Sequence, residues 1–129
     1  MTAAPNWIDA VVRDFGRGAG MDSFALNERG VAALRFEDGR TLRFEYVNDE
    51  LAVSMSVPVR NDAATARRIL ATAHPSAARD GLRVRAGYLE KTGCAVFAVR
   101  FAARDVTRPA LERAFGVLWR IASEYGGAA

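Results

Sequence analysis

The sequence predicts an α+β domain in which an antiparallel sheet packs against helices. Residues 31–57 form three consecutive runs in which apolar and mixed, more polar positions alternate, with turn residues between the runs. Strict period two is typical of strands that bury one face. Two further alternating runs follow at 82–89 and 94–101, and amphipathic helical patterns flank the strands. The predicted order is α-β-β-β-α-β-β-α, and 129 residues suffice for one domain spanning 1–129.

The first helix is predicted over residues 5–17. Pro5 suits a first turn, and the apolar residues fall three and four positions apart, as on one helical face. That stripe comprises Trp7, Ile8, Val11, Val12 and Phe15. Gly16, Gly18 and Gly20 then end the helix. We do not interpret this glycine run as a phosphate-binding loop, because it follows a helix and no helix begins after it.

The meander at 31–57 has one predominantly apolar face. Asp38-Gly39 between the first two runs supplies the positive φ that a hairpin turn needs, and Asn48-Asp49-Glu50 breaks the pattern again. An open sheet cannot leave such a face in water, so the helices must cover it. The predicted face consists of Leu34, Phe36, Leu42, Phe44, Tyr46, Leu51, Val53, Met55 and Val57.

A second helix and two more strands follow the meander. Asp62 can cap a helix that runs to about Ala73, and His74-Pro75 ends it. The fourth strand, 82–89, alternates through Leu82, Val84, Ala86 and Tyr88. The fifth strand, 94–101, is apolar on both faces, which indicates a central strand or one with a covered second face. We interpret Cys94 there as a small buried hydrophobe.

The last and longest helix is predicted from Thr107 to Tyr125, with Thr107 as its cap and Pro109 in its first turn. Its stripe comprises Leu111, Ala114, Phe115, Leu118, Ile121, Ala122 and Tyr125, and Trp119 falls beside it, either as its edge or as an exposed anchor. We expect the sheet and this helix to bury Phe36, Leu42, Phe44, Val53, Phe97, Val99, Phe115 and Leu118.

Charge is distributed unevenly along the chain. Up to Val59 there are six Lys/Arg and nine Asp/Glu, which gives −3; from Arg60 to Arg113 there are eleven and five, which gives +6; the remainder is neutral, so the sum is the net +3. A basic half can bind acidic partners or nucleic acid. The basic residues are dispersed without interleaved aromatics, so nucleic acid is the alternative and not the main expectation. No secretory signal or membrane-length apolar run is present, which predicts a cytoplasmic protein.

No constellation of residues indicates catalysis. The single cysteine excludes an internal disulfide, and the single histidine, His74, lacks the partners that nucleophilic or metal chemistry requires. We therefore expect no catalytic residues, no metal and no cofactor. A small enzyme with an unrecognised site is the remaining alternative. The favoured reading is a protein that binds through surface shape and apolar area.

The lead-in to the meander resembles a known family. The run Gly20-Met21-Asp22, then 26–31 (Leu-Asn-Glu-Arg-Gly-Val), then Leu34-Arg35-Phe36 is similar to class I type III secretion chaperones, the Tir-chaperone-like family. Length and element order match over nearly the whole chain. The resemblance implies a cytosolic homodimer that holds the N-terminal segment of a secreted effector in extended form. One departure is that family members are usually acidic, whereas this chain is basic.

The resemblance also implies where the partners bind. It places the effector on the first helix and the nearby sheet surface, and we assign Trp7, Val11, Leu34 and Phe36 to that contact; the alternative is that all four are core. It places the dimer contact on the second helix and the fourth strand, to which we assign Ile69, Val84 and Ala86. We expect neither a membrane nor nucleic acid as the partner.

Overall fold

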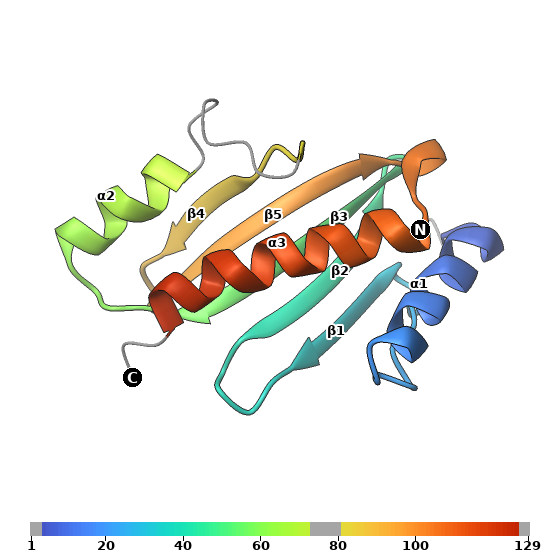
Figure 1. Ribbon diagram of the computed structural model, residues 1–129, viewed down its shortest axis with the longest axis horizontal. Helices are drawn as coiled ribbons and strands as arrows, with labels where there is room; N and C mark the ends of the chain where they lie inside the picture. Colours follow the sequence, from blue (N-terminus) through green and yellow to red (C-terminus); the bar gives the residue numbers. More distant parts are fainter. Residues whose placement is uncertain (1–3, 73–80, 127–129) are drawn as a thin grey trace.

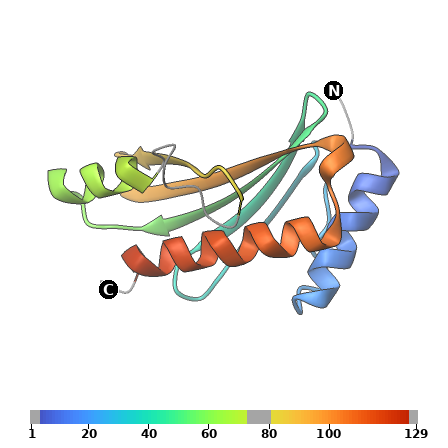
Figure 2. The same ribbon diagram turned by 45° about the horizontal axis from the view of Figure 1, so that its top comes forward.

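The computed structural model describes residues 4–72 and 81–126 (Figures 1 and 2). The elements are α1 (Asn6–Gly18), β1 (Val31–Arg35), β2 (Thr41–Val47), β3 (Glu50–Pro58), α2 (Ala63–Thr72), β4 (Arg85–Leu89), β5 (Cys94–Ala102), the 3-10 turn η2 (Ala103–Asp105) and α3 (Arg108–Gly126). The strands form one five-stranded sheet in the order β1-β2-β3-β5-β4, and every neighbouring pair is antiparallel. The predicted α+β class and element order are confirmed.

Helices α1 and α3 pack on the same face of the sheet. The ring centroid of Phe15 in α1 lies 5.3 Å from that of Phe44 in β2, and Tyr125 at the end of α3 stacks on Phe97 of β5 at 5.5 Å. Helix α3 runs across the middle strands, α1 lies at the β1 end of the sheet, and α2 lies beside β4 at the other end (Figure 1). The core is therefore a two-layer arrangement between one sheet face and two helices.

The strand register matches the predicted alternation. On β2, β3 and β5 the residues predicted to face the core are buried, from Leu42 and Phe44 through Val53 to Phe97 and Val99. Both predicted turns hold. Gly39 adopts a φ of +92°, and Asn48 and Asp49 adopt φ values of +53° and +60°, the left-handed region that a two-residue hairpin requires.

Two of the predicted core residues are only half-buried. Phe36 follows the edge strand β1, and Phe115 lies on the side of α3 that faces the same region, so both lie at the margin of the two-layer core. Conversely, Phe24 in the connector is buried although the sequence showed no periodicity there. Its ring packs edge-on against Phe44, with centroids 5.0 Å apart. Val117 of α3 is also buried beside the predicted stripe.

The predicted caps hold and one strand is shorter than predicted. The backbone N–H of Thr65 donates to Asp62 Oδ1 at 2.7 Å, and that of Ala110 donates to Thr107 Oγ1 at 3.2 Å. Strand β4 begins at Arg85, with only an isolated bridge at Leu82. Val84 is nevertheless buried, as the alternating pattern predicted. Alternation in the sequence indicates which side chains face the core, whether or not the backbone is hydrogen-bonded to a neighbouring strand. Predictions for residues 73–80, including His74, lie outside the described residues.

Cys94 is not the buried hydrophobe that we predicted. It is half-buried at the start of β5, and its thiol lies 3.7 Å from the carbonyl oxygen of Thr92. The side chain lies on the sheet face opposite α1 and α3, across from Pro58 of β3 and the exposed Leu89 of β4, so no helix packs over it in the part of the chain that the structure describes. β5 does lie between β3 and β4, as a strand apolar on both faces predicts.

Candidate functional site

The free edge of β1 leaves backbone groups available for pairing. The backbone N–H of Phe36 donates to the carbonyl of Arg40, and the carbonyl of Gly30 accepts the N–H of Tyr46. The backbone N–H and C=O groups of the even-numbered residues of this strand therefore point toward β2. In an antiparallel pair the intervening residues point the other way. The N–H and C=O groups of Ala33 and Arg35 therefore point away from the sheet.

The start of the same edge is already occupied. The side-chain oxygen of Asn27 accepts from the N–H of Val31 at 3.1 Å, and the carbonyl of Val31 accepts from the N–H of Asn27 at 2.9 Å. These contacts satisfy the outward groups of Val31 in the way a neighbouring strand would. The open part of the edge is therefore short, and it is confined to Ala33 and Arg35.

A hollow of about 270 Å³ lies against this open edge. It is lined by Gly20, Met21, Asp22, Ser23, Phe24, Ala33 and Leu34, so its walls are the connector after α1 and the strand itself. The connector is fixed in place, because Asp9 Oδ1 of α1 accepts the backbone N–H of Leu26 at 2.9 Å. Gly16 allows the close approach: a Cβ there would lie 2.8 Å from the carbonyl oxygen of Met21.

An aromatic cluster continues from the end of β1 onto α3. We define it as Phe36, Phe115 and Trp119, all half-buried. The centroid of Trp119 lies 5.1 Å from that of Phe36, edge-on, and 5.8 Å from that of Phe115. Phe115 in turn contacts Phe15 of α1 at 5.8 Å. The cluster thus joins the hydrophobic core to the surface on the inner side of the open edge.

Arg40 holds this cluster in position. Its guanidinium carbon lies 4.1 Å above the Trp119 ring, and Nη1 donates to Ser123 Oγ at 2.8 Å and to the Trp119 carbonyl at 3.3 Å. Its Nε forms an ion pair with Asp38 Oδ2 at 2.9 Å, and only 9% of the residue is exposed. Because arginine offers a planar fork that both stacks and donates, one residue links the β1–β2 hairpin to the second half of α3.

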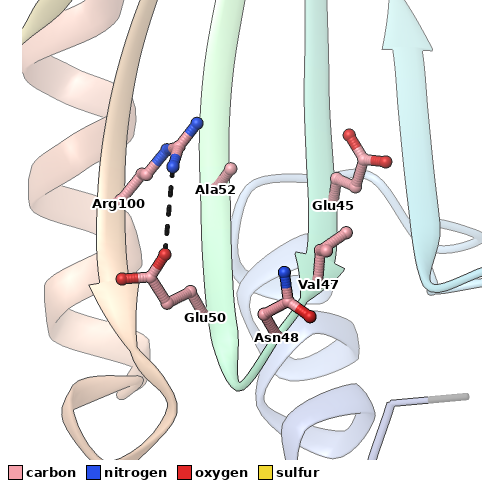
Figure 3. Close-up of a pocket in the computed structure, with 6 residues that line it drawn as sticks. All are labelled: Glu45, Val47, Asn48, Glu50, Ala52 and Arg100. Atoms are coloured by element: carbon pink, nitrogen blue, oxygen red, sulfur yellow. Dashed lines mark ion pairs between the residues drawn. The ribbon is translucent and has the colours of Figure 1, made fainter. Parts of the chain in front are cut away.

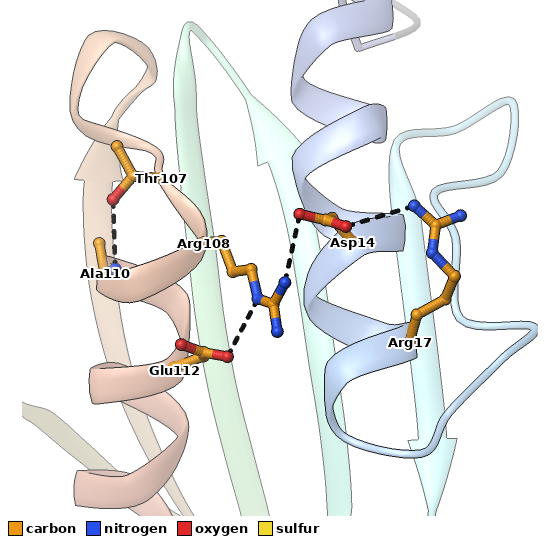
Figure 4. A network of polar contacts seen from close by, with 6 residues as sticks. All are labelled: Asp14, Arg17, Thr107, Arg108, Ala110 and Glu112. Atoms are coloured by element: carbon orange, nitrogen blue, oxygen red, sulfur yellow. Dashed lines mark hydrogen bonds and ion pairs between the residues drawn. The ribbon is translucent and has the colours of Figure 1, made fainter.

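A polar network on the surface links α1 to α3 (Figure 4). Arg108 Nη1 lies 3.6 Å from Asp14 Oδ2, and Arg108 Nε lies 3.2 Å from Glu112 Oε2; Asp14 also contacts Arg17 at 3.3 Å. The hydrogen bond to Glu112 is the largest cause of the raised pKa of Arg108. All these groups are exposed, so we expect them to orient α1 and to contribute little stability.

A second hollow, of about 290 Å³, lies near the β2–β3 hairpin. Glu45, Val47, Asn48, Glu50, Ala52 and Arg100 line it, and Arg100 is 3.9 Å from Glu50 (Figure 3). The small side chain of Ala52 leaves the space between the charged residues. The described residues contain no group of three potential metal ligands here or elsewhere.

The four residues assigned to effector contact occupy two different settings. Trp7 lies in the first turn of α1 and is 49% exposed. Leu34 and Phe36 lie at the C-terminal end of β1 and are half-buried. Val11 is half-buried against the core. Leu34 and Phe36 therefore belong to the open edge and the aromatic cluster, and no described contact joins Trp7 to them.

The residues assigned to the dimer contact lie mostly inside the chain. Ile69 and Val84 are buried, and Ala86 is half-buried against the core. The exposed apolar residues in this region are Leu70 of α2, at 61%, and Leu89 of β4, at 50%. β4 is the other edge strand of the sheet, and within residues 4–72 and 81–126 no strand pairs with its outer side.

These features define the class of the protein: a small α+β binding domain with two open sheet edges. Residues 7–125 match the family model described as "Type III secretory system chaperone SycN", and the chain belongs to this family of type III secretion chaperones. Among curated proteins, none matches the sequence. No helix in the part of the chain that the structure describes is long and apolar enough to span a membrane.

Three solved structures share the fold at low sequence identity. A chain of the ExsC–ExsE complex is 16% identical with a TM-score of 0.79, and the match covers 98% of this chain and 96% of that one. A chain of the HopA1–SchA chaperone–effector complex is 15% identical at 0.70, covering 92% of both. The Yersinia pestis type III secretion chaperone SycH, in complex with a stable fragment of YscM2, gives 16% identity at 0.70, covering 92% of this chain and 98% of that chain.

Sequence reasoning missed two parts of the site. Nothing local marked Arg40 as a stacking residue, because it follows Asp38-Gly39 in a turn where charged residues are ordinarily solvated. The sequence pattern also assigned no role to the side chain of Asn27, which accepts the backbone N–H of Arg29 at 2.8 Å and that of Val31 at 3.1 Å. Asparagine side chains often accept a backbone N–H two residues further on, so Asn27 could have indicated its contact with Arg29 but not its contact with Val31.

Proposed function

We propose that this chain is a non-catalytic, cytoplasmic chaperone that holds the N-terminal segment of a secreted effector in extended form. Two of the solved neighbours are a chaperone–effector complex and a chaperone bound to a stable protein fragment. The observation that carries the proposal is the open edge at Ala33 and Arg35, with Leu34 and Phe36 exposing apolar surface beside it. A guest strand would gain main-chain hydrogen bonds from the edge and side-chain contacts from its flank.

The first helix offers a second contact for the same guest. Trp7 presents a large exposed surface on a helix whose other large residues, Ile8, Val12 and Phe15, are buried. Val11 lies between these two groups on the helix. Because exposed aromatic side chains are common anchors at interfaces, we propose that Trp7 and Val11 contact a part of the guest that continues beyond the strand edge.

The edge can be tested with one backbone substitution. Ala33→Pro removes an N–H that points away from β2, so the sheet itself keeps all its hydrogen bonds. We expect this variant to lose capture of the effector's N-terminal fragment while its thermal stability stays near that of the wild type. Ala33→Val, which retains the N–H, is the matched control. Equal capture by the two variants would contradict pairing at this edge.

We further propose that the chain acts as a homodimer through α2 and β4. Leu70 and Leu89 expose apolar surface beside a free strand edge, the combination that self-association would cover. Light scattering at micromolar concentration should give the mass of a dimer, and Leu70→Glu should shift it to a monomer. Val47→Glu changes an apolar residue of similar exposure at the β2–β3 hairpin and should leave the mass unchanged. A monomeric wild type would contradict the proposal.

A further inference from the structure

We propose that the open edge of β1 selects a guest segment in which large apolar residues flank an acidic residue. This inference rests on the proposed function, and it adds the sequence pattern that the guest must carry. It follows from the faces on which three consecutive residues lie: Leu34 and Phe36 on the helix-covered face, and Arg35 on the opposite face.

Pairing geometry fixes the order of the guest side chains. A residue directly opposite another in a neighbouring strand points to the same face of the sheet, in either strand direction. Guest residues opposite Leu34 and Phe36 therefore point toward the helices, and the one between them points to the other face beside Arg35. Because Asn27 already satisfies Val31, these three positions are the centre of the available edge.

The inner face suits large apolar side chains. Next to Leu34 is the hollow of about 270 Å³, and next to Phe36 is the half-buried aromatic cluster. Arg40 keeps Trp119 edge-on to Phe36, since it stacks on the indole and hydrogen-bonds the carbonyl of Trp119 itself. A preorganised aromatic surface loses little conformational entropy when an apolar residue packs on it.

The outer face suits a carboxylate. Arg35 is exposed, and it forms no ion pair within residues 4–72 and 81–126. Its cross-strand neighbour is the neutral Thr41, and the nearby Arg43 is already paired with Glu45 at 3.6 Å. A guest residue opposite Arg35 would thus meet an uncompensated positive charge. Opposite charges in directly facing positions stabilise a strand pair, and like charges destabilise it.

The test uses two synthetic twelve-residue peptides with identical Thr/Ser flanks and central sequences Leu-Glu-Leu or Leu-Lys-Leu. Binding to the full chain is followed by NMR titration at low salt. We expect the glutamate peptide to bind about three- to tenfold more tightly, because an attractive cross-strand pair replaces a repulsive one of similar size, and we expect the preference to shrink in high salt. Arg35→Glu should reverse the preference, and Arg35→Gln should abolish it.

Two further arms separate this inference from the proposed function. A peptide with Ser-Glu-Ser at its centre should bind more weakly than the Leu-Glu-Leu peptide. Ala33→Pro should abolish binding of every peptide. Equal binding of the glutamate and lysine peptides, lost on Ala33→Pro, would overturn the charge rule and leave edge binding intact. Binding that survives Ala33→Pro, or no binding of any peptide, would overturn both.

Discussion

The two free edges of the sheet, β1 and β4, differ in what surrounds them. Beside β1 lie the hollow of about 270 Å³ and the half-buried aromatic cluster. The side chain of Asn27 already accepts a hydrogen bond from the start of this edge. Beside β4 lies a whole helix, α2, with buried Ile69 on one side and exposed Leu70 on the other. Unpaired strand edges can bind another strand. The fold thus has one short edge beside a hollow and an aromatic cluster, and one edge beside the surface of a helix.

Charge separates the two regions as well. The positive excess of the chain lies from Arg60 onward, and a large part of it gathers at the β4 end on Arg60, Arg67, Arg68, Arg83 and Arg85. Of these, Arg68 lies 4.8 Å above the Tyr125 ring. The part of the chain up to Val59, which includes β1, has a net charge of −3, although β1 itself carries the exposed Arg35. The basic character of the chain therefore belongs mainly to the region that we propose for self-association.

The largest expected loss of stability follows from a substitution in the hydrophobic core, which both regions share. Phe44 is fully buried and its ring contacts those of Phe15 and Phe24. Phe44→Ala should lower the free energy of unfolding by about 3–5 kcal/mol, the range for emptying a buried aromatic site. Urea denaturation measures this, with exposed Val47→Ala as the control that should change little. A loss below about 1 kcal/mol would contradict the register of β2.

In the β4 region, substitutions at two neighbouring residues of α2 should separate the contribution to folding from the contribution to dimerisation. Ile69→Ala removes a fully buried side chain and should cost about 2–5 kcal/mol of unfolding free energy. Leu70→Ala removes an exposed one and should leave monomer stability nearly unchanged while weakening the dimer. Denaturation and light scattering on both variants separate folding from association. Equal destabilisation by the two would place Leu70 in the core of the folded chain.

These contrasts also show what the sequence could predict. Period two identified the buried face of β2, β3 and β5 because a one-residue shift would expose every large side chain. The same pattern could not tell whether Ile69 and Val84 are buried by this chain or by a second copy, since periodicity reports burial and not the layer that causes it. For the same reason, Phe36 and Phe115 were predicted as core, although they are only half-buried at its margin.

The effector-contact residues show a related limit. The stripe of α1 gave five apolar residues without indicating that Trp7 alone among them has about half of its surface exposed. Arg40 and Trp119 are 79 positions apart, so their stacking depends on the final placement of α3 over the hairpin. Local patterns carry no information on such a contact, whereas the caps at Asp62 and Thr107 depend on neighbours three residues away and were predicted correctly.

On the β1 side, the expected effect of changing Arg40 is smaller than that of emptying the core. Arg40→Lys keeps the charge but loses the planar stacking and the paired donors. We expect a loss of about 1–3 kcal/mol, the range for leaving partly buried polar groups without partners. Near-ultraviolet circular dichroism in a Trp7→Phe background should report the altered surroundings of Trp119, and capture of the guest should fall. An unchanged spectrum would show that Trp119 keeps its position without Arg40.

The smallest expected effect concerns the pH dependence of α2. The pKa of Asp62 is lowered chiefly because its carboxylate accepts the backbone N–H of Thr65. A group whose pKa is lower in the folded state stabilises the fold above its unfolded pKa, about 4, and this contribution is lost as the pH falls through the lower, folded value. Helix α1 has no side-chain cap, so acid should loosen the β4 side through this group and leave the β1 side unaffected by it.

Asp62→Asn isolates the effect, because asparagine also caps helices but does not titrate in this range. Amide hydrogen exchange in α2 should be faster in the wild type at pH 3 than at pH 6 after correction for the intrinsic rate, and the variant should show a smaller change. Exchange in β1 serves as the internal reference in both proteins. If the wild type and the variant lose protection in α2 equally between pH 6 and pH 3, the charge of Asp62 does not cause the pH dependence of this helix.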